Sequence, residues 1–161
     1  MNLSHPSRPL RRTLLQFTGA LGVLGTVAAA GLLKTTQAVA AVWNKAGFES
    51  KAVADAMKSL GASSAAESRD IVITAPDIAE NGAVVPIEVV SRIPNTQSIS
   101  IIAEKNPFPL SATAEFANGA EPYAYVRIKM GQTSHVRAVV KADGKFFTAS
   151  KEVKITVGGC G

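Results

Sequence analysis

The stretch YAYVRIKM, residues 123–130, alternates between two kinds of side chain. Tyr123, Tyr125, Arg127 and Lys129 fall on one face of an extended chain, and the apolar residues between them fall on the other. A period of two places successive side chains on opposite faces of a strand. The stretch therefore predicts a β-strand with one face turned toward a core.

Six further runs of β-type residues follow the same logic, and turn residues separate them. They span 70–74, 84–90, 98–103, 136–141, 145–148 and 152–157. Asp143-Gly144 predicts a hairpin turn, and Pro86 indicates that the run 84–90 is an edge strand or contains a bulge. Seven short strands at this spacing favour a mainly β fold, an antiparallel β-sandwich of immunoglobulin-like architecture over residues 70–157.

Two segments between these runs predict loops. Residues 76–82 end in Asn81-Gly82, a strong turn pair. Residues 106–110 contain two prolines, each of which fixes φ and removes a hydrogen-bond donor, so we expect a stiff loop there.

Residues 41–69 precede the predicted sandwich and contain one helical pattern. Apolar side chains recur at helical spacing from Phe48 to Leu60, and Gly61 stands just past the last of them. We expect a short amphipathic helix over residues 48–60. Trp43, Phe48 and Met57 are expected to pack in a core, and a partner interface is the alternative for them.

Residues 1–40 have the features of a cleaved export signal. A weakly apolar stretch, residues 14–33, follows a basic segment, and an A-x-A cleavage pattern ends at Ala40. The adjacent Arg11 and Arg12 resemble a twin-arginine signal, which predicts export to the periplasm. An ordinary secretory signal and an uncleaved anchor remain alternatives, since about 20 apolar residues can span a bilayer.

The residues after Ala40 are close to electrically neutral. They contain 13 Lys and Arg against 12 Asp and Glu, so the positive charge of the whole chain comes largely from its first 40 residues. They also lack a cluster of basic residues with interleaved aromatic ones. We therefore expect no nucleic acid and no membrane as a partner.

The single cysteine, Cys160, stands one residue from the C-terminus. Gly158, Gly159 and Gly161 surround it, and glycine adds no bulk and leaves the backbone free. Residues 158–161 therefore predict a flexible arm with an accessible thiol, and four residues past residue 157 reach at most roughly 13–14 Å. A lone cysteine in an exported chain indicates intermolecular pairing or a reactive thiol.

Metal and cofactor chemistry has little support in the sequence. Cys160 is the only cysteine, and His135 is the only histidine after Ala40. A structural zinc site takes four protein ligands, so this pair is too small a set. We expect no metal site and no resident cofactor, and we expect His135 to face solvent or a partner from its strand.

Four segments form a specific set in a fixed order. They are PDIAENG with VP (76–82, 85–86), EKNP with PL (104–107, 109–110), RIK with TS (127–129, 133–134), and VKITVGGCG (153–161). Together they resemble SoxY, the family of sulfur-carrier subunits in the periplasmic Sox system of thiosulfate oxidation. That family usually ends in Gly-Gly-Cys-Gly-Gly. The single glycine after Cys160 brings the terminal carboxylate closer to the thiol, which disfavours the thiolate.

The resemblance implies a carrier rather than an enzyme. In that family, a haem-containing enzyme joins the cysteine that matches Cys160 oxidatively to thiosulfate. A hydrolase then releases sulfate, and a sulfur dehydrogenase oxidises the sulfane sulfur that stays bound. The resemblance also implies a heterodimer with a SoxZ-like subunit. We therefore expect S-thiosulfonate or sulfane sulfur on Cys160 and no catalytic residue in this chain.

Two other functions remain open. A periplasmic β-sandwich interaction module would use Cys160 for a disulfide to another chain. A thiol enzyme acting alone would need a base and an orienting group beside Cys160, and the sequence shows no such set.

Overall fold

Strands make up most of the regular secondary structure. The structure is a computed structural model, and it describes residues 43–156. Two helices come first, α2 (Lys45–Phe48) and α3 (Val53–Ser59). The strands that follow are β1 (Ala66–Glu67), β2 (Ile71–Thr74), β3 (Ile78–Ala79), β4 (Val85–Ser91), β5 (Thr96–Ala103), β6 (Leu110–Glu115), β7 (Tyr123–Ile128), β8 (Ser134–Ala142) and β9 (Lys145–Ile155).

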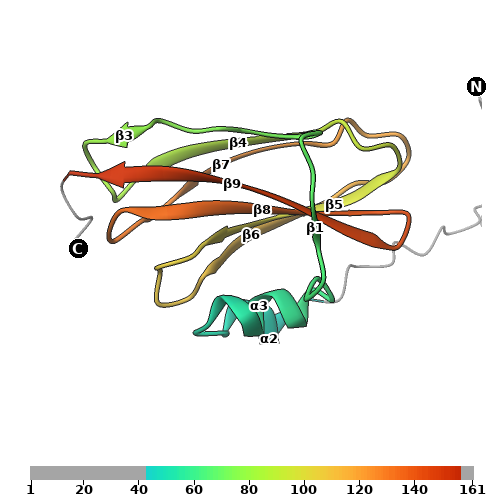
Figure 1. The fold of residues 1–161 in the computed structure, drawn as a ribbon, viewed down its shortest axis with the longest axis horizontal. Coiled ribbons are helices and arrows are strands. Elements are labelled where there is room, and N and C mark those ends of the chain that lie inside the picture. Colours follow the sequence, from blue (N-terminus) through green and yellow to red (C-terminus); the bar gives the residue numbers. More distant parts are fainter. Residues whose placement is uncertain (1–42, 157–161) are drawn as a thin grey trace, which may run out of the picture. The chain divides into compact units, whose positions relative to one another are not determined.

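The strands form two layers that face each other (Figure 1). The larger sheet has the order β1-β9-β8-β5-β6, with β3 as a further neighbour of β9, and the smaller sheet has the order β2-β4-β7. The predicted mainly β sandwich is confirmed. All pairings between the longer strands are antiparallel, as predicted. The two-residue strands β1 and β3, which the sequence did not predict, run parallel to β9.

The main core lies between the two sheets. Val85, Ile87 and Val89 of β4 are fully buried, while the residues between them stay exposed or half-buried, as a period of two requires. Ile99 of β5 and Val140 of β8 meet them from the larger sheet within the same cluster. Each such side chain contributes roughly 1.5–3 kcal/mol on full burial.

A second apolar cluster lies on the other face of the larger sheet. Ile102, Leu110 and Val139 are buried there, and Ala56 of α3 packs with them. Figure 1 shows both helices on this side of the sandwich. Because β5 is covered on both faces, Ile101 and Ile102 are both buried although they are adjacent.

The predicted helix over 48–60 is shorter in the structure, where it is α3, and a separate short helix, α2, precedes it and ends at Phe48. Asn44 accepts a hydrogen bond from the amide of Gly47 and begins α2, and the hydroxyl of Ser50 donates to the carbonyl of Ala46. Such a side-chain bond competes with helix propagation, and Ala52 is extended before α3 begins. The predicted end is confirmed at Gly61, which has a φ of +77°.

The prediction that Trp43 packs in a core is wrong. Trp43 is 67% exposed and stacks on Phe48, with 4.4 Å between the ring centroids. Phe48 and Met57 are only partly buried, at the margin of the second cluster.

Pro86 does not place its strand at an edge. β4 is the middle strand of the smaller sheet, between β2 and β7. However, β2 pairs only with Glu88 and the residues after it, so no β2 residue lies beside Pro86. Proline has no amide hydrogen to donate, and at Pro86 the sheet consists only of β4 and β7, so no bond to β2 is lost there.

Two predicted strands, 145–148 and 152–157, form one continuous strand, β9. Their connection to β8 is the predicted hairpin, because Asp143 and Gly144 both have positive φ, 48° and 72°. This geometry belongs to a type I′ turn. Residues 110–115 were not predicted as a strand, yet they form β6 at the edge of the larger sheet.

Candidate functional site

The predicted site residues lie outside the described part of the chain. Cys160, Gly158, Gly159 and Gly161 follow Thr156, the last residue that the structure describes, and therefore lie outside it. Arg11 and Arg12 lie outside it as well. The geometry that the structure provides is the end of β9, from which residues 157–161 continue. We call this region the arm base, meaning residues 154–156 and the groups bonded to them.

Hydrogen bonds hold the arm base on both sides. The amides of Lys154 and Thr156 donate to the carbonyls of Asp77 and Ala79, at 3.0 and 3.2 Å. The amide of Ile155 points the other way and donates to Oγ1 of Thr133 at 2.9 Å. Successive amides of a strand point to opposite sides, so β3 and Thr133 together secure both edges of β9 up to its last residues.

A salt bridge joins β9 to the segment before β3. Nζ of Lys151 lies 3.0 Å from a carboxylate oxygen of Asp77 and 2.7 Å from the carbonyl oxygen of Ala75. Lys151 lies opposite the buried Val136 in the β8–β9 register, so its side chain starts on the core-facing side of β9. Its long side chain reaches from the margin of the core to the polar segment that leads into β3.

Loops from distant parts of the sequence meet at this end of the sandwich (Figure 1). The carbonyl of Gly82 accepts a hydrogen bond from the amide of Met130 at 2.7 Å, and Asn106 donates through Nδ2 to the carbonyl of Lys129 at 2.6 Å. Asn81 accepts a bond from the amide of Ala83 and so closes the predicted turn. The segments 76–82, 104–107 and 127–134 therefore frame the arm base.

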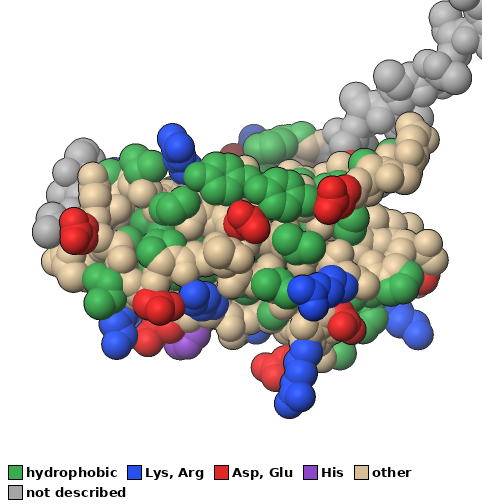
Figure 2. Space-filling model, turned by 90° about the horizontal axis from the view of Figure 1, so that it is seen from above, with side chains coloured by type: hydrophobic (Ala, Val, Ile, Leu, Met, Phe, Trp, Pro, Cys, Tyr) green, Lys and Arg blue, Asp and Glu red, His purple; other side chains and the backbone are tan. Residues whose placement is uncertain are grey.

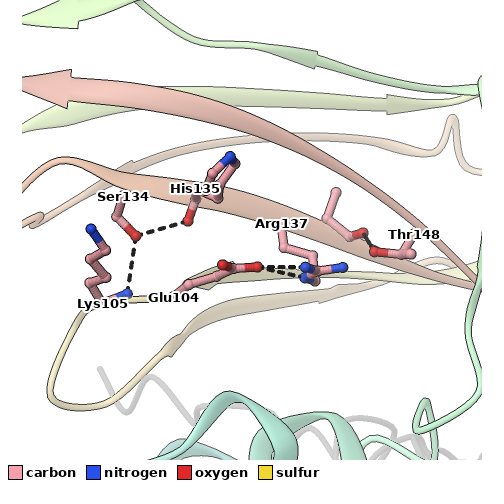
Figure 3. A network of polar contacts seen from close by, with 7 residues as sticks. Glu104, Lys105, Ser134, His135, Arg137 and Thr148 are labelled. Carbon is pink, nitrogen blue, oxygen red and sulfur yellow. Dashed lines mark hydrogen bonds and ion pairs between the residues drawn. The ribbon is translucent and has the colours of Figure 1, made fainter.

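The β5–β6 loop is joined to β8 by the polar contacts in Figure 3. Oγ of Ser134 accepts a hydrogen bond from the amide of Lys105 at 3.0 Å and donates to the carbonyl of His135. Nε and Nη2 of Arg137 both donate to Oε1 of Glu104, at 2.8 and 2.6 Å. Both side chains are about one quarter exposed, so water screens the pair only in part.

The contacts of the arm base are hydrogen bonds and one salt bridge. Within residues 43–156, no three His, Asp or Glu side chains come together as a metal site. His135 is exposed and lies opposite Glu152 in the β8–β9 register, as expected for a strand residue that faces solvent or a partner. No helix in this part of the chain is long and apolar enough to span a membrane.

Sequence reasoning did not anticipate Thr133 and Asp77 as the groups that hold the end of β9. Thr133 follows the strand run 123–130 and lies in a polar segment that reads as an ordinary turn. Its partner, the amide of Ile155, is 22 residues away. The signal available in the sequence was only that both residues belong to segments of the resembled family.

Comparison with known proteins identifies the family. The model of the family "Sulfur oxidation protein SoxY" matches residues 56–160, which is most of the chain and extends to Cys160. The chain belongs to the SoxY family. It is 37% identical to the sulfur carrier protein SoxY from Chlorobium limicola f thiosulfatophilum, a solved structure. That match covers 66% of this chain and 94% of that chain, with a TM-score of 0.60.

Other solved structures are less similar. A superoxide reductase (neelaredoxin) from Ignicoccus hospitalis is 21% identical, with a TM-score of 0.48. The match covers 54% of this chain and 80% of that one. No curated protein matches this sequence. The family model and the SoxY structure from Chlorobium limicola carry the family assignment. They confirm the resemblance that the four sequence segments indicated.

Proposed function

We propose that this chain carries sulfur intermediates covalently on Cys160 during the oxidation of thiosulfate. The observation that supports this most is the family match, which extends through the predicted arm to Cys160. The similar SoxY chain from Chlorobium limicola is described as a sulfur carrier protein, which favours the same role here.

The arm base explains how such a carrier would work. The chain is held up to Thr156, just past the end of β9, and Cys160 is the fourth residue after it. Four residues span at most about 14 Å. A partner enzyme that takes the thiol into its active site must therefore approach the framed end of the sandwich, while the sandwich itself stays outside.

The chemistry at Cys160 begins with an oxidation. The thiol loses its proton and joins the outer sulfur of thiosulfate to give a Cys–S–S–SO3⁻ conjugate. Two electrons leave, and we propose that a haem-containing partner accepts them. Water then attacks the sulfonate sulfur, sulfate and two protons are released, and Cys–S–S⁻ remains. A sulfur dehydrogenase would oxidise this sulfane sulfur. The carrier supplies the thiol, and the partner enzymes supply catalysis.

Assembly and location complete the proposal. We infer that the chain forms a heterodimer with a SoxZ-like subunit in the periplasm, and that Arg11 and Arg12 direct it there by the twin-arginine route. That route exports folded proteins, so it could carry a companion that has no signal of its own. Changing both arginines to lysine is expected to leave both chains in the cytoplasm. The idea is wrong if the companion still reaches the periplasm.

A Cys160→Ser variant tests the carrier role. Combined with the partner enzymes and thiosulfate, the wild-type chain is expected to support sulfate release and the variant is expected to support none. The variant should still bind its companion subunit, because the change lies in the arm. Undiminished sulfate release by the variant would refute the proposal, and activity of the wild-type chain without partners would indicate an enzyme instead.

A further inference from the structure

The sequence contains two Asn-Gly pairs, Asn81-Gly82 and Asn118-Gly119. In such a pair the backbone amide of the glycine can attack the side-chain amide of the asparagine, because glycine has no Cβ to hinder the approach. The reaction also needs an accessible asparagine and a peptide group that can rotate between the two residues. Both pairs have the same chemistry, so the fold decides which of them reacts.

The first pair is held on both sides. Oδ1 of Asn81 accepts a hydrogen bond from the amide of Ala83 at 2.8 Å. Gly82 is buried, and its carbonyl accepts the hydrogen bond of the Met130 amide at 2.7 Å. Before the pair, the carbonyl of Ala79 is bonded to the arm base. Rotation of the peptide group between Asn81 and Gly82 must therefore break two hydrogen bonds and move a buried residue.

The second pair lies in an exposed turn of the loop between β6 and β7. Asn118 and Gly119 have positive φ, 55° and 76°, and the amide of Ala120 donates to the carbonyl of Ala117 at 3.1 Å, as in a type I′ turn. All four residues are exposed. Among residues 43–156, the side chain of Asn118 has no hydrogen-bond partner. One exposed hydrogen bond therefore resists the rotation at this pair.

The surroundings of the turn leave room for ring closure. A Cβ at Gly119 would meet no atom within 4 Å. The turn borders a cavity of about 530 Å³, which Arg92 and Pro94 of the β4–β5 loop also line. Figure 1 shows both loops at the end of the sandwich opposite to the arm base. In Figure 2 this end, at the right, is largely tan, the colour of backbone and uncharged polar side chains. No neighbouring group therefore blocks a reaction at Asn118.

We propose that Asn118 is a site of spontaneous deamidation in the folded chain and that the fold protects Asn81. The amide nitrogen of Gly119 loses its proton and attacks Cγ of Asn118. The bond from this nitrogen to Cγ forms, the bond from Cγ to Nδ2 breaks, and the side-chain nitrogen takes up a proton and leaves as ammonia. The product is a succinimide ring, which water opens to aspartate or isoaspartate. The reaction needs no oxidant, reductant or enzyme.

The modification changes the charge and the shape of the turn. Both products place a carboxylate at residue 118, in the cavity that Arg92 also lines. Isoaspartate in addition inserts a methylene group into the backbone, so the four-residue turn is expected to open. The arm base lies at the other end of the sandwich (Figure 1). Deamidation therefore accumulates with the age of the chain and does not depend on the proposed carrier function.

Peptide mapping of the purified chain after storage at mildly alkaline pH tests the inference. Trypsin cleaves after lysine and arginine, so the two asparagines fall in separate peptides, residues 70–92 and 106–127. Mass spectrometry detects the change from amide to carboxylate, and an isoaspartate methyltransferase labels the isomerised product. In the folded chain, Asn118 is expected to convert at least about fivefold faster than Asn81. One hydrogen bond fewer must break at Asn118, and each such bond is worth roughly a factor of five.

The same chain unfolded in guanidinium chloride is the matched control. Both pairs are then free, so the two asparagines are expected to convert at rates within about twofold of each other. Asn118→Gln should abolish conversion in the peptide 106–127, because glutamine must close a larger ring. Asn81→Gln should leave the rate at Asn118 unchanged. A circular dichroism melt checks that both variants are folded.

A smaller ratio between the two asparagines in the folded chain, or faster conversion at Asn81, would overturn the inference. An intact Asn118 in the folded chain, over a time in which the unfolded chain converts, would overturn it as well. The wild-type chain alone supplies both comparisons, so the test stands even if a variant fails to fold. Sulfur bound to Cys160 is a separate readout, and the proposed function stands or fails on that readout alone.

Discussion

Removing the hydroxyl of Thr133 is expected to loosen the end of β9. Oγ1 of Thr133 accepts the hydrogen bond of the Ile155 amide at 2.9 Å, on the edge of β9 opposite β3. A Thr133→Val variant keeps the shape of the side chain and loses this acceptor. The net value of such a bond is about 1 kcal/mol, which corresponds to a roughly fivefold change in a local equilibrium constant.

Amide hydrogen exchange followed by NMR measures this change directly, because exchange at the end of a strand reports local opening. The Ile155 amide is expected to exchange roughly fivefold faster in Thr133→Val. Thr133→Ser keeps the hydroxyl and should exchange like the wild type. The amide of the buried Val153 is an internal control and should change little. An Ile155 exchange rate equal to that of the wild type in Thr133→Val would refute the account of how the arm base is held.

Two further predictions concern the tyrosines of β7 and the packing of α2. In a Tyr125→Phe variant, Tyr123 is the only tyrosine, and ultraviolet titration should show it ionising above pH 10.0, with Glu88→Gln shifting the midpoint back toward that value. Because Tyr123 keeps its proton more strongly in the folded chain, the folded state should lose stability as the pH rises past about 10; a midpoint at or below 10.0 would contradict this. Gly47→Ala should destabilise the chain by about 1–2 kcal/mol in thermal unfolding, because a Cβ there lies 2.6 Å from Oγ of Ser59. Gly131→Ala, which meets no atom within 4 Å, should unfold like the wild type, and equal melting of the two variants would contradict the packing argument.

The strands that sequence predicted are those whose own residues favour burial on one face. The sequence of β7 alternates cleanly and that of β4 imperfectly, but burial alternates in both because one side of each meets the core. Asp143-Gly144 forms its turn from local backbone preference. β6 escaped prediction because its sequence, LSATAE, has only one large apolar residue. β6 forms because it pairs with β5, and the contacts between the two strands include a 3.0 Å hydrogen bond between the hydroxyls of Ser100 and Thr113.

The other features that the sequence did not predict depend on contacts between distant segments. β3 is two residues long and exists because Ile78 and Ala79 lie alongside the end of β9. The polar residues in the middle of β9 suggested a break, yet Lys151 continues the strand because its ammonium group reaches Asp77 and Ala75. For the candidate site, the sequence predicted Cys160 as the reactive residue, and this stays a prediction because Cys160 lies outside the described residues. The groups that hold the arm base could not be predicted, because they are far from it in the sequence and only the fold brings them together.

The central claim, that Cys160 carries sulfur, is tested most directly by the intact mass of the chain. The protein would be taken from the periplasm of cells that are oxidising thiosulfate and measured before and after reduction. The account predicts added mass that maps to Cys160, equals a thiosulfonate or sulfane sulfur group, and disappears on reduction. An unmodified thiol during active turnover, or only a disulfide to another chain, would contradict the account and favour the interaction module.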